Sequence, residues 1–380
     1  MKVCGINISM NKKLLFVVNV DWFFVSHRLP IALAAIKQGY EVHIACGITD
    51  KRDLLESHGV IVHPLTLSRS GVGVLNELKT LKQLLSVIKK VKPGITHSVT
   101  IKPVLYGNIV ARLLRVPVRI SSISGLGYVF IAKGFKAKLF RLFISTLYKL
   151  ALTSSQTIIF QNKADRDTLK ALGAVKTEQE VFIRGSGVNL NLYPVVDEPK
   201  GQPVVMLLAR LLIDKGVNEF AEAAKIIKST NAEVRMVLVG DADLENPKSI
   251  SPKQLTHWVD AGIIEHWGYS TDVATTMAQA NIIVLPSYRE GLPKSLIEAA
   301  ACGRAVITTD VPGCRDAIEP NKTGLLVPVK SSSFLAEAVL KLLDDKVLRH
   351  DFSVNGRKLA ETAFDINDVI SKHLTIYNQT

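Results

Sequence analysis

The chain has 380 residues, of which 47% are hydrophobic and 6% aromatic. This length predicts two domains of ordinary size, with enough apolar residues for two cores. The four cysteines form no C-x-x-C pair, so we expect reduced thiols in a cytosolic protein and exclude a zinc site of the usual spacing.

Charge is distributed unevenly along the chain, whose formal net charge is +13. Residues 1–190 hold 27 lysines and arginines against 10 acidic residues, whereas residues 191–380 hold 20 against 24. No acidic residue lies between Glu77 and Asp165, although 15 basic residues do. A field of one sign attracts polyanions, either nucleic acid or the anionic headgroups of a membrane, unless it serves only solubility.

The first half alternates between short apolar runs, which predict buried strands, and segments with a helical spacing of apolar residues. We expect strands at 13–19, 42–46, 60–65, 95–97, 118–122, 157–160 and 181–183. We expect a loop at 20–27 and helices at 28–38, 53–58, 74–91, 104–114, 135–152 and 163–172. This alternation predicts a parallel, doubly wound sheet in a domain of residues 1–190.

Residues 191–202 are rich in proline and charge and show no periodicity, so we expect a linker there. A second domain follows at 203–362, with strands at 204–209, 234–239, 263–267, 282–285 and 305–309. Its helices are expected at 216–228, 252–261, 272–280, 294–302, 334–343 and 351–362. Residues 363–380 form a separate C-terminal segment with a helix at 366–377.

Two glutamates stand eight residues apart around the start of the helix at 294–302. Glu290 lies in the preceding loop and Glu298 lies about one turn inside the helix. Gly291 and Leu292 lie where the helix begins, and free N–H groups at such a position favour an anion. The pair can therefore hold the hydroxyls of a ligand whose phosphates lie at the helix start, although a glutamate near a helix start is often only a favourable dipole contact.

A cationic pair follows the first strand of the second domain. Arg210 and Lys215 lie between a strand end and a helix start, where the carboxyl ends of parallel strands bind ligands. A planar fork and a point charge suit a diphosphate.

The string around the two glutamates closely resembles the donor-site motif of the family 4 retaining glycosyltransferases. It reads REGLP at 289–293, IEAAACG at 297–303 and DVPG at 310–313. The resemblance implies an α/β fold of the GT-B type, in which two Rossmann-like doubly wound domains face a central cleft. It also implies that the last helix crosses back to the first domain.

The resemblance assigns expected roles to the second domain. Arg210 and Lys215 match the R-x4-K pair that binds the donor pyrophosphate, Glu290 would hold the donor sugar as the catalytic carboxylate, and Glu298 would hold the ribose. Gly268 and Tyr269 match the base-binding turn, where uracil is the usual base, although the sequence leaves UDP and GDP open. Gly291 and Leu292 complete the expected donor site.

In the first domain, His27 and Arg28 follow the first strand, where they can contact the donor phosphate or an acceptor diphosphate, or serve in packing. His97 and Lys102 follow another strand and are expected to face the same cleft, with a structural role equally open for His97. Gly187 and Asn189 match the family's G-V-[DN] turn beside the cleft.

The chain departs from the family after the strand at 118–122. Many members carry a histidine in a V-H-G-like string, whereas this chain has Ser124, Gly125, Leu126 and Gly127. Serine is not a general base near neutral pH without help, so the resemblance leaves open whether any residue acts as one. Members that act on polyprenyl-diphosphate-linked sugars show a similar G-L-G string.

The segment 133–152 interleaves cations with apolar residues at helical spacing: Phe135, Leu139, Leu142, Phe143, Leu147 and Leu150. A basic amphipathic helix indicates an interfacial membrane anchor, and the alternative is a core-facing helix with a solvated basic edge. We expect neither a signal peptide nor a spanning helix, since about seven apolar residues follow Lys13 and no apolar stretch reaches about 18 residues.

Taken together, these features predict a retaining transferase of a hexose or N-acetylhexosamine from a UDP-sugar to a lipid-diphosphate-linked saccharide, as in O-antigen or capsule assembly. We expect no metal or other cofactor, no nucleic-acid partner, and a cytoplasmic protein bound peripherally to the inner membrane. The rival readings are a UDP-sugar 2-epimerase of the same architecture and a non-enzymatic polyanion-binding protein.

Overall fold

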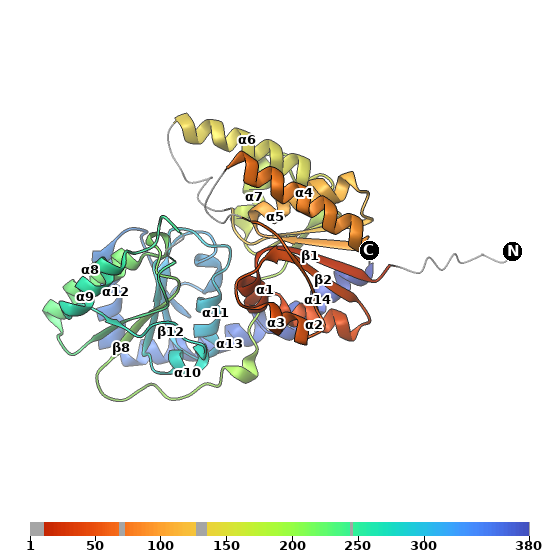
Figure 1. The fold of residues 1–380 in the computed structure, drawn as a ribbon. Helices are drawn as coiled ribbons and strands as arrows, with labels where there is room; N and C mark the ends of the chain where they lie inside the picture. Colours follow the sequence, from red (N-terminus) through yellow and green to blue (C-terminus); the bar gives the residue numbers. More distant parts are fainter. Residues whose placement is uncertain (1–10, 68–72, 127–134, 244–245, 380) are drawn as a thin grey trace.

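The computed structural model describes residues 11–67, 73–126, 135–243 and 246–379, which form two separate parallel sheets (Figure 1). The first sheet has the strand order β3-β2-β1-β4-β5-β6-β7 and the second has the order β10-β9-β8-β11-β12-β13. Each order reverses beside its first strand, β1 or β8, and ligands of such sheets bind where this reversal occurs. The predicted α/β fold with two doubly wound domains is confirmed.

In the N-terminal domain, strands with near-continuous apolar sequence are buried under helices on both faces, as is typical of parallel sheets. The strands are β1 (Lys13–Val20), β2 (Glu41–Gly47), β3 (Ile61–Pro64), β4 (Ile95–Val99), β5 (Val118–Ile123), β6 (Thr157–Phe160) and β7 (Glu180–Phe182). The helices are α1 (Asp21–His27), α2 (Leu29–Lys37), α3 (Arg52–Ser57), α4 (Val74–Val91), α5 (Ile101–Leu113), α6 (Phe135–Leu152) and α7 (Lys163–Ala171).

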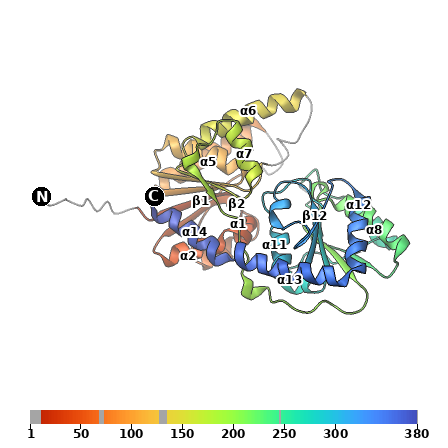
Figure 2. The same cartoon turned by 180° about the vertical axis from the view of Figure 1, so that it is seen from behind.

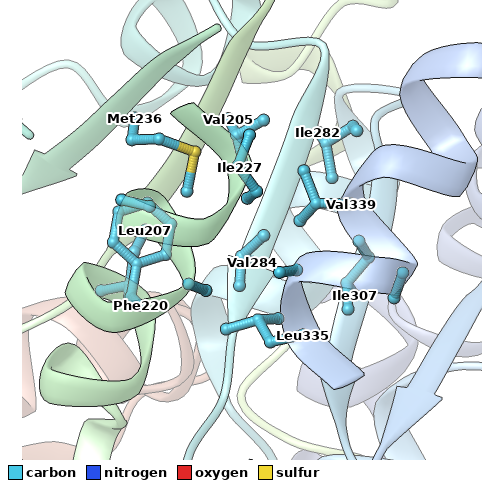
Figure 3. Close-up of a cluster of buried hydrophobic side chains, with 14 of the residues drawn as sticks. Val205, Leu207, Phe220, Ile227, Met236, Ile282, Val284, Ile307, Leu335 and Val339 are labelled. Atoms are coloured by element: carbon cyan, nitrogen blue, oxygen red, sulfur yellow. The ribbon is translucent and has the colours of Figure 1, made fainter. Parts of the chain in front are cut away.

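The C-terminal domain repeats this plan with β8 (Val204–Leu208), β9 (Arg235–Val239), β10 (Glu265–His266), β11 (Ile282–Leu285), β12 (Ala305–Thr309) and β13 (Gly324–Val327). Its helices are α8 (Val217–Thr230), α9 (Pro252–Asp260), α10 (Val273–Ala278), α11 (Lys294–Ala301), α12 (Ser332–Asp344) and α13 (Lys346–Ala363). Figure 3 shows its core, where Val284 and Ile307 from the sheet pack against Phe220 of α8 and Val339 of α12.

Two elements differ from the sequence prediction. Residues 21–27 form helix α1 instead of a loop, and its first residue, Asp21, is buried and accepts hydrogen bonds from the backbone N–H groups of Trp22, Thr49 and Lys51. Local spacing does not show the two distant donors, Thr49 and Lys51. The prediction also missed β13, a four-residue strand at the edge of the sheet that begins with a glycine.

The chain passes between the domains twice, and the two passes lie side by side. The N–H of Val188 donates to the carbonyl of Phe364 at 2.8 Å, and the N–H of Ile366 donates to the carbonyl of Val188 at 3.0 Å. Gly187 has a φ of +75°, and a Cβ there would lie 2.8 Å from the Cα of Ile366, so only glycine fits this contact. Helix α14 (Ile366–Gln379) then packs against α2 of the N-terminal domain, as Figure 2 shows.

The segment 191–202, which we expected to be a linker, is held on the C-terminal domain. The buried guanidinium of Arg304 donates to the carbonyls of Val196 and Asp197 at 2.9 and 3.2 Å. Arg349 of α13 forms an ion pair with Glu198 at 2.8 Å. This connection therefore has a fixed path across the domain.

Helix α6 carries exposed apolar side chains, of which Leu142 is 65% and Phe143 59% exposed. Helix α4 adds Leu75 at 82% and Leu78 at 57%. Residues 133–134 and the side chains of 135–140 lie outside the described structure. Among the described residues, no helix combines the length and the apolar character that crossing a bilayer requires.

Candidate active site

A cavity of about 1230 Å³ lies between the two domains, at the carboxyl ends of both sheets. Its lining includes residues that follow β1, β5 and β6 in the N-terminal domain and residues that follow β8 and β11 in the C-terminal domain. Figures 1 and 2 both show α1 and α11 facing each other across the domain boundary. The size and position suit a ligand that touches both domains.

Glu290 lies in the loop between β11 and α11 and lines this cavity. Its Oε1 accepts a hydrogen bond from Nζ of Lys215 at 2.5 Å, and both side chains are mostly buried. Gly313 packs closely against the backbone of this loop, because a Cβ added at Gly313 would lie 2.4 Å from the carbonyl oxygen of Glu290. The structure therefore joins the acidic motif and the R-x4-K motif in one ion pair.

Arg210, the other cation of that motif, also lines the cavity. Its Nη1 lies 3.1 Å from Oδ2 of Asp243, and its guanidinium lies 5.5 Å from the centroid of the Trp22 ring in the N-terminal domain. The side chain is 45% exposed, so it is accessible to a ligand. Together with Lys215 it provides the two cations that a diphosphate needs.

Glu298 lies on the cavity side of α11 and is 5% exposed. Its Oε1 accepts a hydrogen bond from Oη of Tyr193 at 2.7 Å and lies 3.4 Å from Nζ of Lys294. Lys294 also donates to the carbonyl oxygen of Ser26, in the N-terminal domain, at 2.8 Å. Among the described residues no side chain caps the amino end of α11, which leaves its backbone N–H groups available to an anion.

The N-terminal wall of the cavity presents uncharged polar groups. Ser124 has a buried Oγ with no hydrogen-bond partner among the described residues, and Gln161, 7% exposed, follows β6. His27 stacks on Phe23 and shares a hydrogen bond between its Nδ1 and the carbonyl of Phe23 at 3.2 Å. Burial, with the nearby Lys294, lowers the pKa of His27 from 6.5 to about 3, so the imidazole is neutral near pH 7.

The two walls touch at a pair of glycines. A Cβ on Gly125 would lie 3.2 Å from the backbone nitrogen of Gly291, and a Cβ on Gly291 would lie 2.4 Å from the carbonyl oxygen of Ser124. Nδ2 of Asn162 donates to the carbonyl of Gly291 at 2.7 Å. Glycine at both positions therefore lets the loop that carries Glu290 approach the N-terminal domain.

Comparisons with known proteins cover both domains. The family model described as "Glycosyl transferases group 1" matches residues 192–359, and the model described as "Glycosyl transferase 4-like" matches residues 13–162. The N,N'-diacetylbacillosaminyl-diphospho-undecaprenol alpha-1,3-N-acetylgalactosaminyltransferase of Campylobacter jejuni is 30% identical over 365 residues, which are 93% of this chain and 94% of the relative. The chain belongs to the family 4 glycosyltransferases.

Further relatives and solved structures agree with this family. A UDP-Gal:alpha-D-GlcNAc-diphosphoundecaprenol alpha-1,3-galactosyltransferase of Escherichia coli is 25% identical over 329 residues, 82% of each chain. The crystal structure of Anabaena HepE in complex with UDP and glucose matches with a TM-score of 0.75 at 17% identity, over 97% of this chain and 99% of that one. WaaG, a glycosyltransferase involved in lipopolysaccharide biosynthesis, also gives 0.75, at 16% identity over 96% and 99%. At 16–17% identity, the likeness to these two structures shows the GT-B architecture.

Three expected cleft residues of this glycosyltransferase lie away from the cavity. His97 belongs to β4, which continues to Val99, and its buried ring shares hydrogen bonds with Oη of Tyr377 and Oγ of Ser122, both at 2.7 Å. Lys102 forms an ion pair with Glu77 of α4 at 2.7 Å. Asn189 is exposed and caps the turn at 190–192.

Arg28 is also displaced from the cavity, because it is buried beneath α14. It is 1% exposed, its Nη1 donates to the carbonyl of His27 at 3.1 Å, and its Nε has no partner among the described residues. Burial lowers its pKa to about 10. Gly187 supports the domain crossing described above, so neither residue reaches a cavity ligand.

The expected base-binding turn is only partly at the cavity. Tyr269 lines it and is 70% exposed, whereas Gly268 turns the chain with a φ of +72° and accepts a hydrogen bond from Gly240. Gly291 and Leu292 both line the cavity, while Gly127 lies outside the described residues. No cluster of three His, Cys, Asp or Glu side chains suited to a metal is found in the described part of the chain.

Sequence reasoning missed three residues of the site. Gln161 directly follows a predicted strand, so the rule that ligands bind at strand ends could have found it. Tyr193 lies in the expected linker, where no periodic pattern marks it, and Trp22 lies in the segment expected to be a loop. The positions of Tyr193 and Trp22 depend on contacts between distant parts of the chain.

Proposed function

We propose that the protein transfers a hexose or N-acetylhexosamine from a UDP-sugar to a lipid-diphosphate-linked sugar, with retention at the anomeric carbon. The observation that carries the proposal is the ion pair of Lys215 and Glu290 in the cavity between the domains. It brings a cation suited to the diphosphate within hydrogen-bond distance of a carboxylate suited to sugar hydroxyls. A sugar diphosphate bound there would have its glycosidic bond beside this pair.

The C-terminal wall supplies the donor site in this proposal. Lys215, Arg210 and the N–H groups at the start of α11 would stabilise the charge that develops on the departing UDP. Glu290 would hold the donor sugar, and Glu298 would accept hydrogen bonds from the ribose. Tyr269, exposed beside the cavity, would contact the base.

The reaction then needs one nucleophile and one proton acceptor. The acceptor hydroxyl would attack the anomeric carbon from the face that UDP leaves, forming the new C–O bond as the bond to the diphosphate breaks. Its proton would pass to a phosphate oxygen of UDP. His27 is the nearest imidazole on the N-terminal wall, and its lowered pKa makes it a poor base, which supports this route over a histidine-assisted one.

The acceptor class is proposed on two grounds. The relatives from Campylobacter jejuni and Escherichia coli are named for undecaprenyl-diphosphate-linked substrates. The exposed apolar and basic side chains of α4 and α6 fit an anionic membrane surface, where such a lipid resides. Flotation with liposomes should therefore require anionic lipid and should weaken as salt rises, whereas equal binding to neutral vesicles would remove the electrostatic part of the proposal.

The decisive experiment incubates the protein with a panel of UDP-sugars and polyprenyl-diphosphate-linked sugars, with and without EDTA. We expect a glycosylated lipid whose new linkage has the anomeric configuration of the donor, formed equally well in EDTA because the two cations and α11 serve the diphosphate. An inverted linkage would refute retention, and activity restored only by Mg²⁺ or Mn²⁺ would refute metal independence.

The same panel separates the rival functions. A 2-epimerase would convert a UDP-sugar without any acceptor lipid, which NMR of the nucleotide sugar would detect. A polyanion-binding protein would shift duplex DNA in a salt-dependent manner and would not bind UDP.

A further inference from the structure

Tyr193 reaches the donor site from the connection between the domains. Its Oη donates to Oε1 of Glu298 at 2.7 Å, and burial together with this carboxylate raises the pKa of the phenol, which keeps it a donor. The other contact of the carboxylate, an ion pair with Lys294, also involves Oε1. Oε2 of Glu298 therefore has no hydrogen-bond partner among the described residues and remains for a ligand.

The backbone of Tyr193 is tied to the helix that carries Glu298. Nη1 of Arg357, on α13, donates to the carbonyls of both Tyr193 and Ala301 at 2.7 Å. Ala301 is the last residue of α11, so one guanidinium sets the distance between Tyr193 and that helix. Val195 lies close to the end of the same helix, since a Cβ added at Gly303 would be 3.1 Å from its Cγ1.

The two donors to Glu298 differ in what holds them. Lys294 is also bonded to Ser26 of the N-terminal domain, so its position depends on how the domains meet. Tyr193 and its anchors all lie on the C-terminal side of the cavity. Its hydrogen bond therefore does not depend on how the domains meet, and it orients the carboxylate before the ligand arrives, which reduces the entropy lost on binding.

We propose that Tyr193 is a positioning residue of the nucleotide site: its hydroxyl fixes one oxygen of Glu298 so that the other receives the ribose hydroxyls. This inference rests on the proposed function, because it takes the ligand to be a uridine diphosphate. The ring alone would only fill space, which phenylalanine would do equally well, so the role belongs to the hydroxyl.

The test measures binding of UDP, 2'-deoxy-UDP and 3'-deoxy-UDP by calorimetry to the wild type, Tyr193→Phe, Glu298→Gln and the double variant. We expect Tyr193→Phe to weaken UDP binding about fivefold, the scale of one ordinary intramolecular hydrogen bond. We expect the preference for UDP over the deoxy analogue that the wild type binds least well to shrink by about the same factor. In the Glu298→Gln background, Tyr193→Phe should have no further effect.

The matched control is Tyr288→Phe. Tyr288 also donates its Oη to a glutamate, Glu219, at 2.7 Å, but it does not line the cavity. This variant should keep UDP affinity within about twofold, as for a substitution away from the site. Thermal melts of both variants show that each is folded.

Each outcome decides the inference. Equal losses for UDP and both deoxy analogues in Tyr193→Phe would reduce Tyr193 to a structural role and overturn it, as would unchanged UDP affinity. A wild type that binds UDP without discriminating against either deoxy analogue would overturn it and leave the transferase proposal intact. Failure of the folded wild type to bind UDP would overturn the proposed donor and this inference together.

Discussion

The two walls of the cavity differ in how their polar groups are satisfied. On the C-terminal wall each charged group has a partner in place: Lys215 with Glu290, Arg210 with Asp243, and Glu298 with Tyr193 and Lys294. On the N-terminal wall the facing groups are neutral, and Ser124 Oγ has no partner among the described residues. Arg28, which follows His27 in the sequence, is buried away from the cavity.

This difference indicates that the two walls bind different parts of the substrates. In the proposed complex with a diphosphate, cations held in preformed pairs would exchange one anionic partner for another, so the C-terminal wall would need little rearrangement. Neutral polar groups without a protein partner can exchange hydrogen bonds with water at little cost in free energy. They can also bind hydroxyl groups that differ in position. We therefore expect substitutions on the charged wall to affect binding and turnover of the nucleotide sugar, and substitutions on the neutral wall to affect which sugar is used.

The largest effect should come from Glu290→Gln. The amide keeps the shape but weakens the hydrogen bonds to Lys215 and to the donor sugar, so we expect kcat to fall about 100-fold, the scale of one lost transition-state interaction. Steady-state kinetics measure this. Glu319→Gln, which removes a surface carboxylate paired with Lys322, should leave kcat unchanged, and a similar loss there would mean that the effect is not specific to the site.

The two cations of the charged wall should differ. Lys215→Ala removes a phosphate contact and also leaves Glu290 without its partner, so UDP binding should weaken by about 3 kcal/mol. Arg210 is more exposed and should contribute about 1.5 kcal/mol, the lower end for a hydrogen bond to a charged group. Calorimetry with UDP gives both values, and unchanged affinity in both variants would contradict a diphosphate site on this wall.

The contact between the walls can be broken at Gly125. A methyl group there would press against the backbone of Gly291 and shift the loop of Glu290, so we expect kcat/KM to fall about tenfold. Gly201 also has a positive φ, +100°, but open space around it, so Gly201→Ala shares the backbone strain without the contact. Equal activity losses in the two variants would show that strain, rather than the meeting of the walls, is responsible.

A buried histidine of helix α14, His373, predicts a stability that depends on pH. Burial lowers the pKa of His373 from 6.5 to about 3, and Arg28, His97 and Tyr377 are its buried neighbours. Between pH 6.5 and pH 3, His373 is protonated in the unfolded chain but neutral in the folded one. Its contribution to the free energy of unfolding is therefore complete above pH 6.5 and is lost as the pH falls toward 3. Melts of His373→Phe should show a slope smaller by about 1 kcal/mol per pH unit. An unchanged slope would mean that other groups cause the acid loss.

The sequence predicted the charged wall better than the neutral one, for physical reasons. Glu290, Glu298, Arg210 and Lys215 belong to local patterns at strand ends and a helix start, and the structure brings all four to one cavity. His97 followed the same rule and lies elsewhere, because β4 continues past it and α14 covers it. Local spacing does not show which residues will be covered by a helix nearly three hundred positions away, because this depends on the tertiary fold.

The same limits apply to the fold. Long apolar or amphipathic segments such as β1 and α4 were predicted within one residue at each end. The short edge strand β13 and helix α1 were missed, because the first has few residues and the second depends on Asp21 accepting hydrogen bonds from residues 49 and 51. The sequence of the expected linker at 191–202 could not show that it is held by three later arginines, Arg304 before β12 and Arg349 and Arg357 on α13.

The docking of α14 on the N-terminal domain has a consequence for the order in which the protein is made. Ile366, Val369, Ile376 and Tyr377 share one hydrophobic cluster with β1, β2 and α2, so the core of the first domain is completed by residues that are synthesised after the second domain. Domains commonly fold from the N-terminus while the ribosome is still at work. We therefore expect part of the first domain's apolar surface to stay uncovered until the second domain has been translated, and a chain that ends just before residue 366 to leave the first domain incomplete although all of its strands are present.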